Sequence, residues 1–295
     1  MNEYEAQALH AIHAWKTAER SWFGRASELA GRPFDLAGEA ALRVPGAGKL
    51  LEQGIGGMVS LLNEAAHWSV RPDAIHEEYR RAGSVDVREG TDVQRLGLHA
   101  VDRVIGTLSV KYRTAAALEG TTAGMIGLPG IPADVIALTA VNLRAIGEYA
   151  TYCGFDLASQ REKLFALHIM SLASSRSHQG EGLALSQLAR IAQDAAQRRA
   201  WDDLEKHVLA TILQRVARAL GARLTKAKMA QLLPAVGALV GGGFNARFTG
   251  RVCDVAYFLY RERFLAKKYG AEIIARASPD PRFARYPEEY EGQWR

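Results

Sequence analysis

Hydrophobic residues recur along most of this chain at steps of three and four positions, which is the spacing of one face of an α-helix. Leu98, Val101, Ile105 and Leu108 follow this period, and so do the apolar positions of residues 204–216. No stretch shows the alternation of hydrophobic and polar residues that a half-buried β-strand requires. The pattern therefore predicts an all-α protein, built as a single multi-helix globular domain.

Proline, glycine and polar positions indicate where the helices begin and end. We expect an amphipathic helix over residues 3–30, an apolar helix over 47–70 that Pro72 closes, and one long helix over 92–118. Six further helices are expected over residues 131–151, 158–175, 182–197, 201–220, 225–240 and 244–268. This gives three parts, which are an N-terminal amphipathic helix (1–32), a helical domain (33–272) and a flexible, proline-containing tail (273–295).

Two glycine-rich segments without charged residues stand out from the helical pattern, over residues 120–133 and 229–246. Their prolines, Pro129 and Pro132 in the first and Pro234 in the second, argue against a membrane-spanning helix, which needs about 20 mostly apolar residues. We expect each segment to form a glycine-rich helical hairpin. Close helix packing through small residues favours either the core of the domain or contact with a membrane.

Positive charge is concentrated toward the C-terminal end. The formal net charge is +5, but residues 206–268 contain twelve Lys and Arg against two acidic residues. Such a surface attracts phosphate, although cations on helices are often only solvated faces. No groove-reading or RNA-stacking motif accompanies the charge, so nucleic acid is an unlikely partner. The residues expected to face an anionic membrane are Arg215, Arg218, Arg223, Lys226, Lys228, Lys267 and Lys268.

Several polar residues lie within or beside the two apolar segments. A buried charge needs a partner, because an unpaired one costs several kcal/mol. We therefore expect ion pairs across the two hairpins, with Asp134 bound to Arg144 or Arg247. Such a cluster can be architectural, can bind a lipid headgroup or small anion, or can carry out acid–base chemistry. Its expected members are Glu119, Asp134, Asn142, Arg144, Asn245, Arg247 and Asp254.

Other short motifs do not support a cofactor or a metal. The glycines at 241–243 match a dinucleotide-binding pattern but follow a proline-containing apolar run instead of a β-strand. Glu64 and His67 form half of a di-iron motif whose second pair is missing. Cys153 and Cys253 are too few for a disulfide framework, and an acidic start replaces the basic region of a signal peptide. We expect a cytoplasmic protein with no cofactor and no metal.

Sequence blocks in both halves of the chain resemble the EcsC family. The resemblance extends from about residue 40 to 270, and Cys153 stands where a Tyr would be expected. The blocks that carry it are Glu119-Gly-Thr-Thr-Ala-Gly, Ile131-Pro-Ala-Asp134, Tyr152-Cys-Gly154-Phe-Asp156, Glu162-Lys-Leu-Phe-Ala-Leu, Pro234 to Asn245 and Tyr260 to Leu265.

The resemblance implies a bacterial accessory protein associated with an ABC transporter and with secretion, and it implies no catalytic residue. We expect a non-enzymatic cytoplasmic protein that associates peripherally with the anionic inner membrane, or with a membrane-protein partner in a transport or secretion complex. A small anionic ligand is a further possible partner. The hairpins or the first helix, which carries Trp15 and Trp22, would insert shallowly. The alternative is a hydrolase-like enzyme acting on a lipid or peptide, with Glu119, Asp134 and His168 converging in a pocket between the hairpins.

Overall fold

The structure is a computed structural model of the whole chain. It describes residues 1–18, 45–63, 69–84, 86–124, 130–157, 160–174 and 243–270, together with 218, 220–222, 224–226, 228–229 and 272–273. Every regular element in these ranges is a helix, which confirms the predicted all-α, multi-helix globular fold. The two predicted glycine-rich hairpins lie largely outside the described residues, since 125–129 and 230–242 are not among them.

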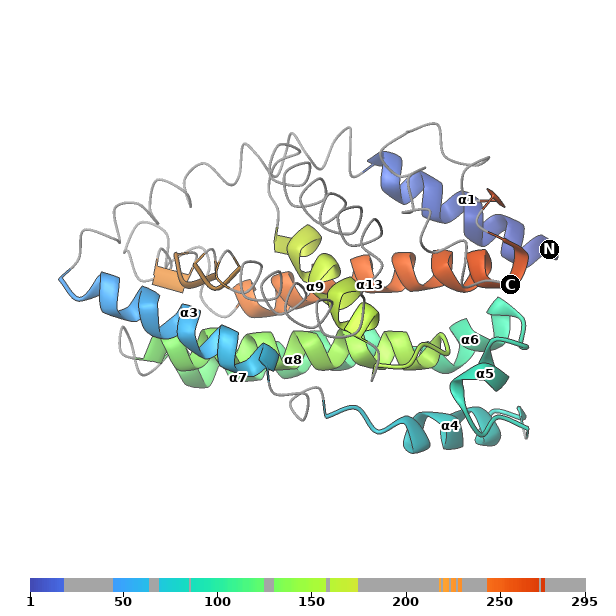
Figure 1. Cartoon of the computed structure of the whole chain (residues 1–295), viewed down its shortest axis with the longest axis horizontal. Coiled ribbons are helices and arrows are strands. Elements are labelled where there is room, and N and C mark those ends of the chain that lie inside the picture. The colour runs from blue at the N-terminus through green and yellow to red at the C-terminus, as the bar shows by residue number, and fades with distance from the viewer. Residues whose placement is uncertain are drawn as a thin grey trace, which may run out of the picture.

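Three long helices run lengthwise through the molecule (Figure 1). They are α7 (Leu108–Gly124), α8 (Ile131–Tyr152) and α13 (Gly243–Tyr269), and each packs against the other two. Helix α3 (Ala47–Asn63) packs on α8, and α9 (Gln160–Ser174) packs on α8 and α13.

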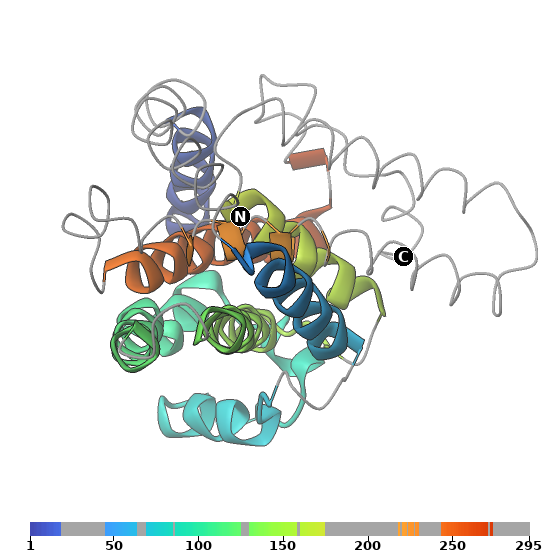
Figure 2. The same cartoon turned by 90° about the vertical axis from the view of Figure 1, so that its left-hand side faces the viewer.

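The remaining helices cover this trio. Helix α1 (Glu3–Ala18) packs on α13 and α6 (Leu98–Ile105), whereas α4 (Pro72–Arg81) and α5 (Gly90–Val93) pack on α8. Viewed along the bundle, α1 and α4 lie on opposite sides of the layer that contains α8 and α13 (Figure 2).

The boundaries of α8, α9 and α13 agree with the predicted ones to within three residues, but two other predictions are corrected. Pro72 begins α4 instead of closing a helix, because the first helical position does not use its N–H. The long helix predicted over 92–118 is three helices. Gly97 is extended at the start of α6, and Gly106 ends α6 with φ +48°, a backbone conformation that glycine tolerates best.

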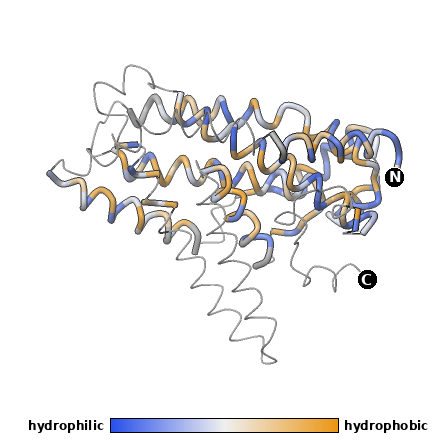
Figure 3. The backbone as a smooth tube through the Cα atoms, turned by 90° about the horizontal axis from the view of Figure 1, so that it is seen from above, coloured by the Kyte–Doolittle hydropathy of each residue, from blue (hydrophilic) through white to orange (hydrophobic). Residues whose placement is uncertain are grey.

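No described helix resembles a membrane span. Hydrophilic positions recur between hydrophobic ones along the helices (Figure 3). Within the described ranges, no helix is long and apolar enough to cross a bilayer.

Three consecutive charged residues of α13 are buried, and each pairs with a different element. Arg261 lies 2.8 Å from Asp102 of α6, and Glu262 pairs with Lys16 of α1. Arg263 makes two hydrogen bonds, of 2.5 and 2.8 Å, to Glu162 of α9. Successive helical residues point about 100° apart, so these pairs hold α13 from several sides.

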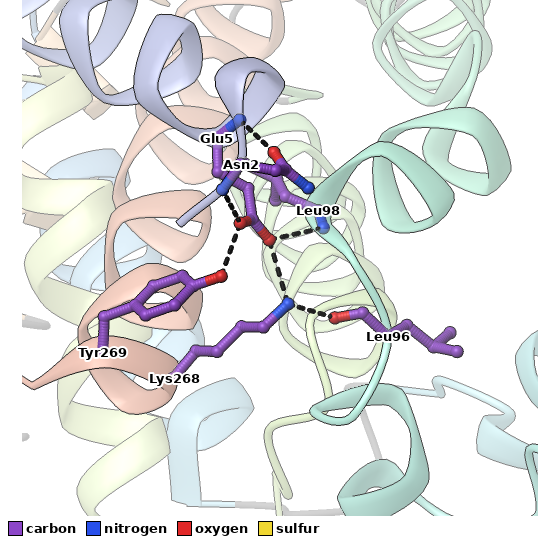
Figure 4. Close-up of polar contacts among 6 residues, drawn as sticks. All are labelled: Asn2, Glu5, Leu96, Leu98, Lys268 and Tyr269. Carbon is purple, nitrogen blue, oxygen red and sulfur yellow. Dashed lines mark hydrogen bonds and ion pairs between the residues drawn. The ribbon is translucent and has the colours of Figure 1, made fainter.

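A buried carboxylate joins α1, α6 and the end of α13 (Figure 4). Glu5 accepts hydrogen bonds from Tyr269 (2.6 Å), Lys268 (2.9 Å), and the backbone N–H groups of Asn2 (3.1 Å) and Leu98 (3.3 Å). Burial alone would raise the pKa of Glu5, but these donors outweigh it and lower the pKa to about 2. Since Leu98 is the first residue of α6, Glu5 supplies the N-terminal cap that a glycine at the preceding position lacks.

The turn after α8 gives a test of this packing. Gly154 has φ +76°, and a Cβ placed there would collide with the backbone carbonyl of Gly90. Gly83 also has positive φ (+97°), but nothing lies within 4 Å of a Cβ at that position. We expect Gly83→Ala to lower the free energy of unfolding by about 1 kcal/mol through backbone strain alone. Gly154→Ala should cost at least about 2 kcal/mol more, because backbone atoms must move. Urea denaturation of both variants measures the difference, and equal losses would contradict the packing at Gly154.

Candidate functional site

The ends of both glycine-rich segments meet at one end of the helix bundle. Glu119 of α7 and Asp134 of α8 flank the first segment. Lys228, in the helical residues near 229, and Asn245, in the first turn of α13, lie at the two ends of the second segment. We call these four residues the junction cluster.

Asn245 is the centre of the junction cluster. Its side-chain Nδ2 donates to Glu119 Oε2 at 3.3 Å and to Asp134 Oδ1 at 3.2 Å, and its Oδ1 accepts a hydrogen bond from Lys228. Lys228 Nζ also lies 2.5 Å from Asp134 Oδ2. An amide is suited to this place because it is a donor and an acceptor at once. The cluster thereby connects three helices and the segment that contains Lys228.

Glycines allow the elements of the cluster to approach closely. A Cβ at position 120 would lie 2.6 Å from Asn245 Nδ2, so glycine leaves room for the amide. On α3, a Cβ at Gly54 would collide with the side chain of Thr225, three residues before Lys228. These contacts give a packing reason for glycine at both positions.

One of the two acids of the cluster, Glu119, has a strongly raised pKa. Burial and the negative charge of Asp134 raise the pKa of Glu119 to about 7, although Lys228 and Asn245 oppose the shift. Burial lowers the pKa of Lys228, and its pairing with Asp134 offsets part of that effect. Two neighbouring carboxyl groups facing one ammonium resist carrying two negative charges together.

The structure unites three of the seven polar residues proposed from the sequence, namely Glu119, Asp134 and Asn245. It corrects the partner of Asp134, which is Lys228 and neither of the two expected arginines. Along α8, Arg144 lies 3.4 Å from Glu148, and Asn142 donates to the Leu138 carbonyl at 2.7 Å. The other two proposed residues, Arg247 and Asp254, are exposed on α13.

The predicted membrane-facing basic surface is also corrected in part. Lys228 is buried in the junction cluster, and Lys268, only 24% exposed, is bound to Glu5. Arg218 and Lys267 are exposed and Lys226 is half-buried. The other two members, Arg215 and Arg223, lie outside the described residues. Sequence reasoning missed the role of Lys228, but a signal was present, since Lys228 borders the second uncharged segment as Asp134 borders the first.

His168 of α9 has surroundings of a different kind. It is half-buried beside the Phe165 ring, with ring centroids 6.1 Å apart. Burial lowers the pKa of His168 to about 4, and no carboxylate contributes to the shift. Over the described ranges, no three His, Cys, Asp or Glu side chains gather as a metal site would require. The contacts of the junction cluster described above involve two carboxyl groups, one amide and one ammonium, and none of them is made by a histidine.

The raised pKa of Glu119 predicts a specific dependence of stability on pH. The pKa of this carboxyl is about 4.5 in the unfolded chain and about 7 in the folded protein. Its contribution to stability is therefore complete below pH 4.5 and is lost as the pH rises from there through about 7. Glu119→Gln removes this loss. The free energy of unfolding of the variant, relative to the parent, should therefore increase by about 2 kcal/mol from pH 5 to pH 8. Urea titrations at both pH values test this, with exposed Glu52→Gln as the control that should show no such change. A difference that stays constant with pH would contradict the assignment.

Comparison of the sequence with known proteins identifies its family. No solved structure matches the chain. In Bacillus subtilis (strain 168), protein EcsC is 26% identical over 193 residues, covering 65% of this chain and 76% of EcsC. YdbA of the same organism, described as uncharacterized, is 22% identical over 268 residues, covering 89% of this chain and 93% of YdbA. The sequence profile of the EcsC protein family matches residues 6–265, which include most of α1 and the whole junction cluster. The chain belongs to the EcsC protein family.

Proposed function

We propose that this protein is a non-enzymatic accessory protein that associates peripherally with an anionic membrane at its cytoplasmic face. The docking end is the end of the bundle that carries the junction cluster, which we call the glycine-rich end. One observation carries the proposal. The junction cluster brings together the ends of two uncharged, glycine-rich segments, 120–133 and 229–246, and its Lys228–Asp134 ion pair is buried. The described ends of both uncharged segments thus lie together, and we propose that the segments themselves supply the uncharged, apolar chain that shallow insertion requires.

Cations lie around this end. Lys49 is exposed in the first turn of α3, and Arg247 is exposed two residues after Asn245. Lys226 is half-buried and follows Thr225, which packs on Gly54 of α3. We call Lys49, Lys226 and Arg247 the cationic rim. Each Lys or Arg close to an anionic membrane contributes about 1 kcal/mol of attraction.

The first helix is a weaker candidate for insertion. Trp15 stacks on Phe258 of α13 with ring centroids 4.7 Å apart, and Leu9 and Ile12 are buried in the core. The apolar face of α1 is therefore used for packing within the protein. Trp22, which was also expected to insert, lies outside the described residues. This packing favours the glycine-rich end as the docking end.

Charge reversal of the cationic rim tests the proposal. The triple variant Lys49→Glu, Lys226→Glu and Arg247→Glu should lower the partition coefficient on phosphatidylglycerol vesicles by at least about 100-fold, because three attractive charges become repulsive. Vesicle sedimentation measures the bound fraction. Binding of the parent should weaken with salt and be slight on phosphatidylcholine vesicles.

The matched control is a second triple variant, which changes the net charge by the same amount at the other end of the bundle. Arg81, Arg95 and Arg103 are exposed on and around α4 to α6, and their replacement by Glu should leave vesicle binding largely intact. Equal loss in both triple variants would show that only net charge matters. Absence of parent binding to anionic vesicles would refute the proposed function.

A second candidate is favoured by the carboxyl pair. Glu119 has a pKa of about 7 beside Asp134, which suits a general acid or base at neutral pH. In this hydrolase-like function, Glu119 would exchange a proton with a lipid or peptide substrate held near Asn245. His168 would have no part in the proton transfer.

Hydrolysis assays separate this candidate from the accessory function. If the carboxyl pair is catalytic, ester or peptide hydrolysis should follow the titration of a group near pH 7 and fall at least about 100-fold in Glu119→Gln. The control Glu52→Gln should retain activity. If the parent protein does not hydrolyse a panel of phospholipids and peptides, the enzymatic candidate is excluded for those substrates.

A further inference from the structure

Helix α7 exposes large hydrophobic side chains at two positions. Val110 is 59% exposed and Leu118 is 65% exposed. Apart from Met1, they are the exposed large hydrophobic residues of the described chain. Thr114, also exposed, lies one turn from each, so the three residues form a stripe along one face of the helix. We call Val110, Thr114 and Leu118 the α7 stripe.

The charges beside the α7 stripe are positive. Lys111 and Arg113 are exposed on its two sides, and no acidic residue occupies an exposed position of α7. Lys111 is held in place by an ion pair of 2.8 Å to Glu148 of α8, whose side chain is buried. An ordinary surface helix turns its charges outward and its apolar residues inward. An apolar centre with flanking cations is instead typical of a helix lying in a membrane interface, where Lys and Arg extend toward phosphate.

The position of α7 in the bundle fits this reading. Helix α7 lies at the outer edge of the bundle beside α8 (Figure 2). Leu118 immediately precedes Glu119 of the junction cluster, so the α7 stripe leads directly to the glycine-rich end. The α7 stripe therefore ends one residue before the junction cluster.

We infer that the α7 stripe lies against an anionic lipid bilayer at the level of the headgroups, with the exposed cation Arg113 directed to lipid phosphates. This inference rests on the proposed membrane association and adds an orientation to it. A bilayer that contacts both the glycine-rich end and the α7 stripe lies along the length of α7, so the bundle rests on the membrane on its side.

An environment-sensitive label at position 118 tests the inference. Both natural cysteines, Cys153 and Cys253, are buried, so a nitrobenzoxadiazole label can be directed to Leu118→Cys. The control is the label at Ala14→Cys, an exposed position of α1, which α13 separates from α7 (Figures 1 and 2). On phosphatidylglycerol vesicles, emission from position 118 should shift to the blue, increase at least about twofold and be quenched by nitroxide-labelled lipid. Emission from position 14 should not change.

The outcomes separate this inference from the proposed function. Sedimentation with the vesicles but no change at position 118 would overturn the α7 inference and leave the membrane function standing. No sedimentation would overturn both. A change at position 118 that needs no vesicles and grows with protein concentration would assign the α7 stripe to a second copy of this chain, against the inference.

An unlabelled variant gives an independent measurement. Val110→Asn with Leu118→Asn removes apolar surface without changing charge and should lower the vesicle partition coefficient by about tenfold or more. The matched control is Ala11→Asn with Ala14→Asn on the exposed side of α1, which should bind like the parent. Urea denaturation checks that both double variants stay folded. Unchanged binding of the folded α7 variant would overturn the inference.

Discussion

The register of α13 is the constraint on which the rest of the structure depends. Arg261, Glu262 and Arg263 are consecutive, buried and paired with three different elements. A small rotation or shift of α13 would break several of these pairs at once, and a buried charge without its partner costs several kcal/mol. Asn245 lies 16 residues before Arg261 on the same straight element, about 24 Å away along the axis. The buried pairs at one end of α13 therefore help to position the amide at the other end.

At that other end, the junction cluster joins α13 to segments that are far apart in the sequence. Asn245 can bind two carboxyl groups and one ammonium because its amide both donates and accepts. Glycine at position 120 lets the amide come close enough. The ends of the two uncharged segments are therefore held together by polar residues that lie at or beside these ends.

The sequence allowed the helical class to be predicted, together with the boundaries of α8, α9 and α13, because hydrophobic spacing is a local property. It did not reveal the breaks at Gly97 and Gly106. The hydrophobic period continues through Gly106, since α6 and α7 turn Leu98, Val101, Ile105 and Leu108 toward the same core. Three members of the junction cluster could be proposed from their place beside uncharged segments. Lys228 was assigned to the surface because charge density along a sequence does not show that its partner, Asp134, lies 94 residues away.

Long-range pairing of this kind also lowers the positive charge that the basic C-terminal region presents to a partner. Acids from other parts of the chain neutralise four of its cations, which are Lys228, Arg261, Arg263 and Lys268. These four charges therefore contribute little to attraction outside the fold. Attraction to an anionic surface must then come from a few exposed cations placed beside uncharged or apolar surface, and not from the regional excess. Screening over a Debye length of about 8 Å at physiological ionic strength strengthens this conclusion, because only charges close to the contact act on it. The position of each cation relative to the apolar surface is thus more informative than the number of cations in the sequence.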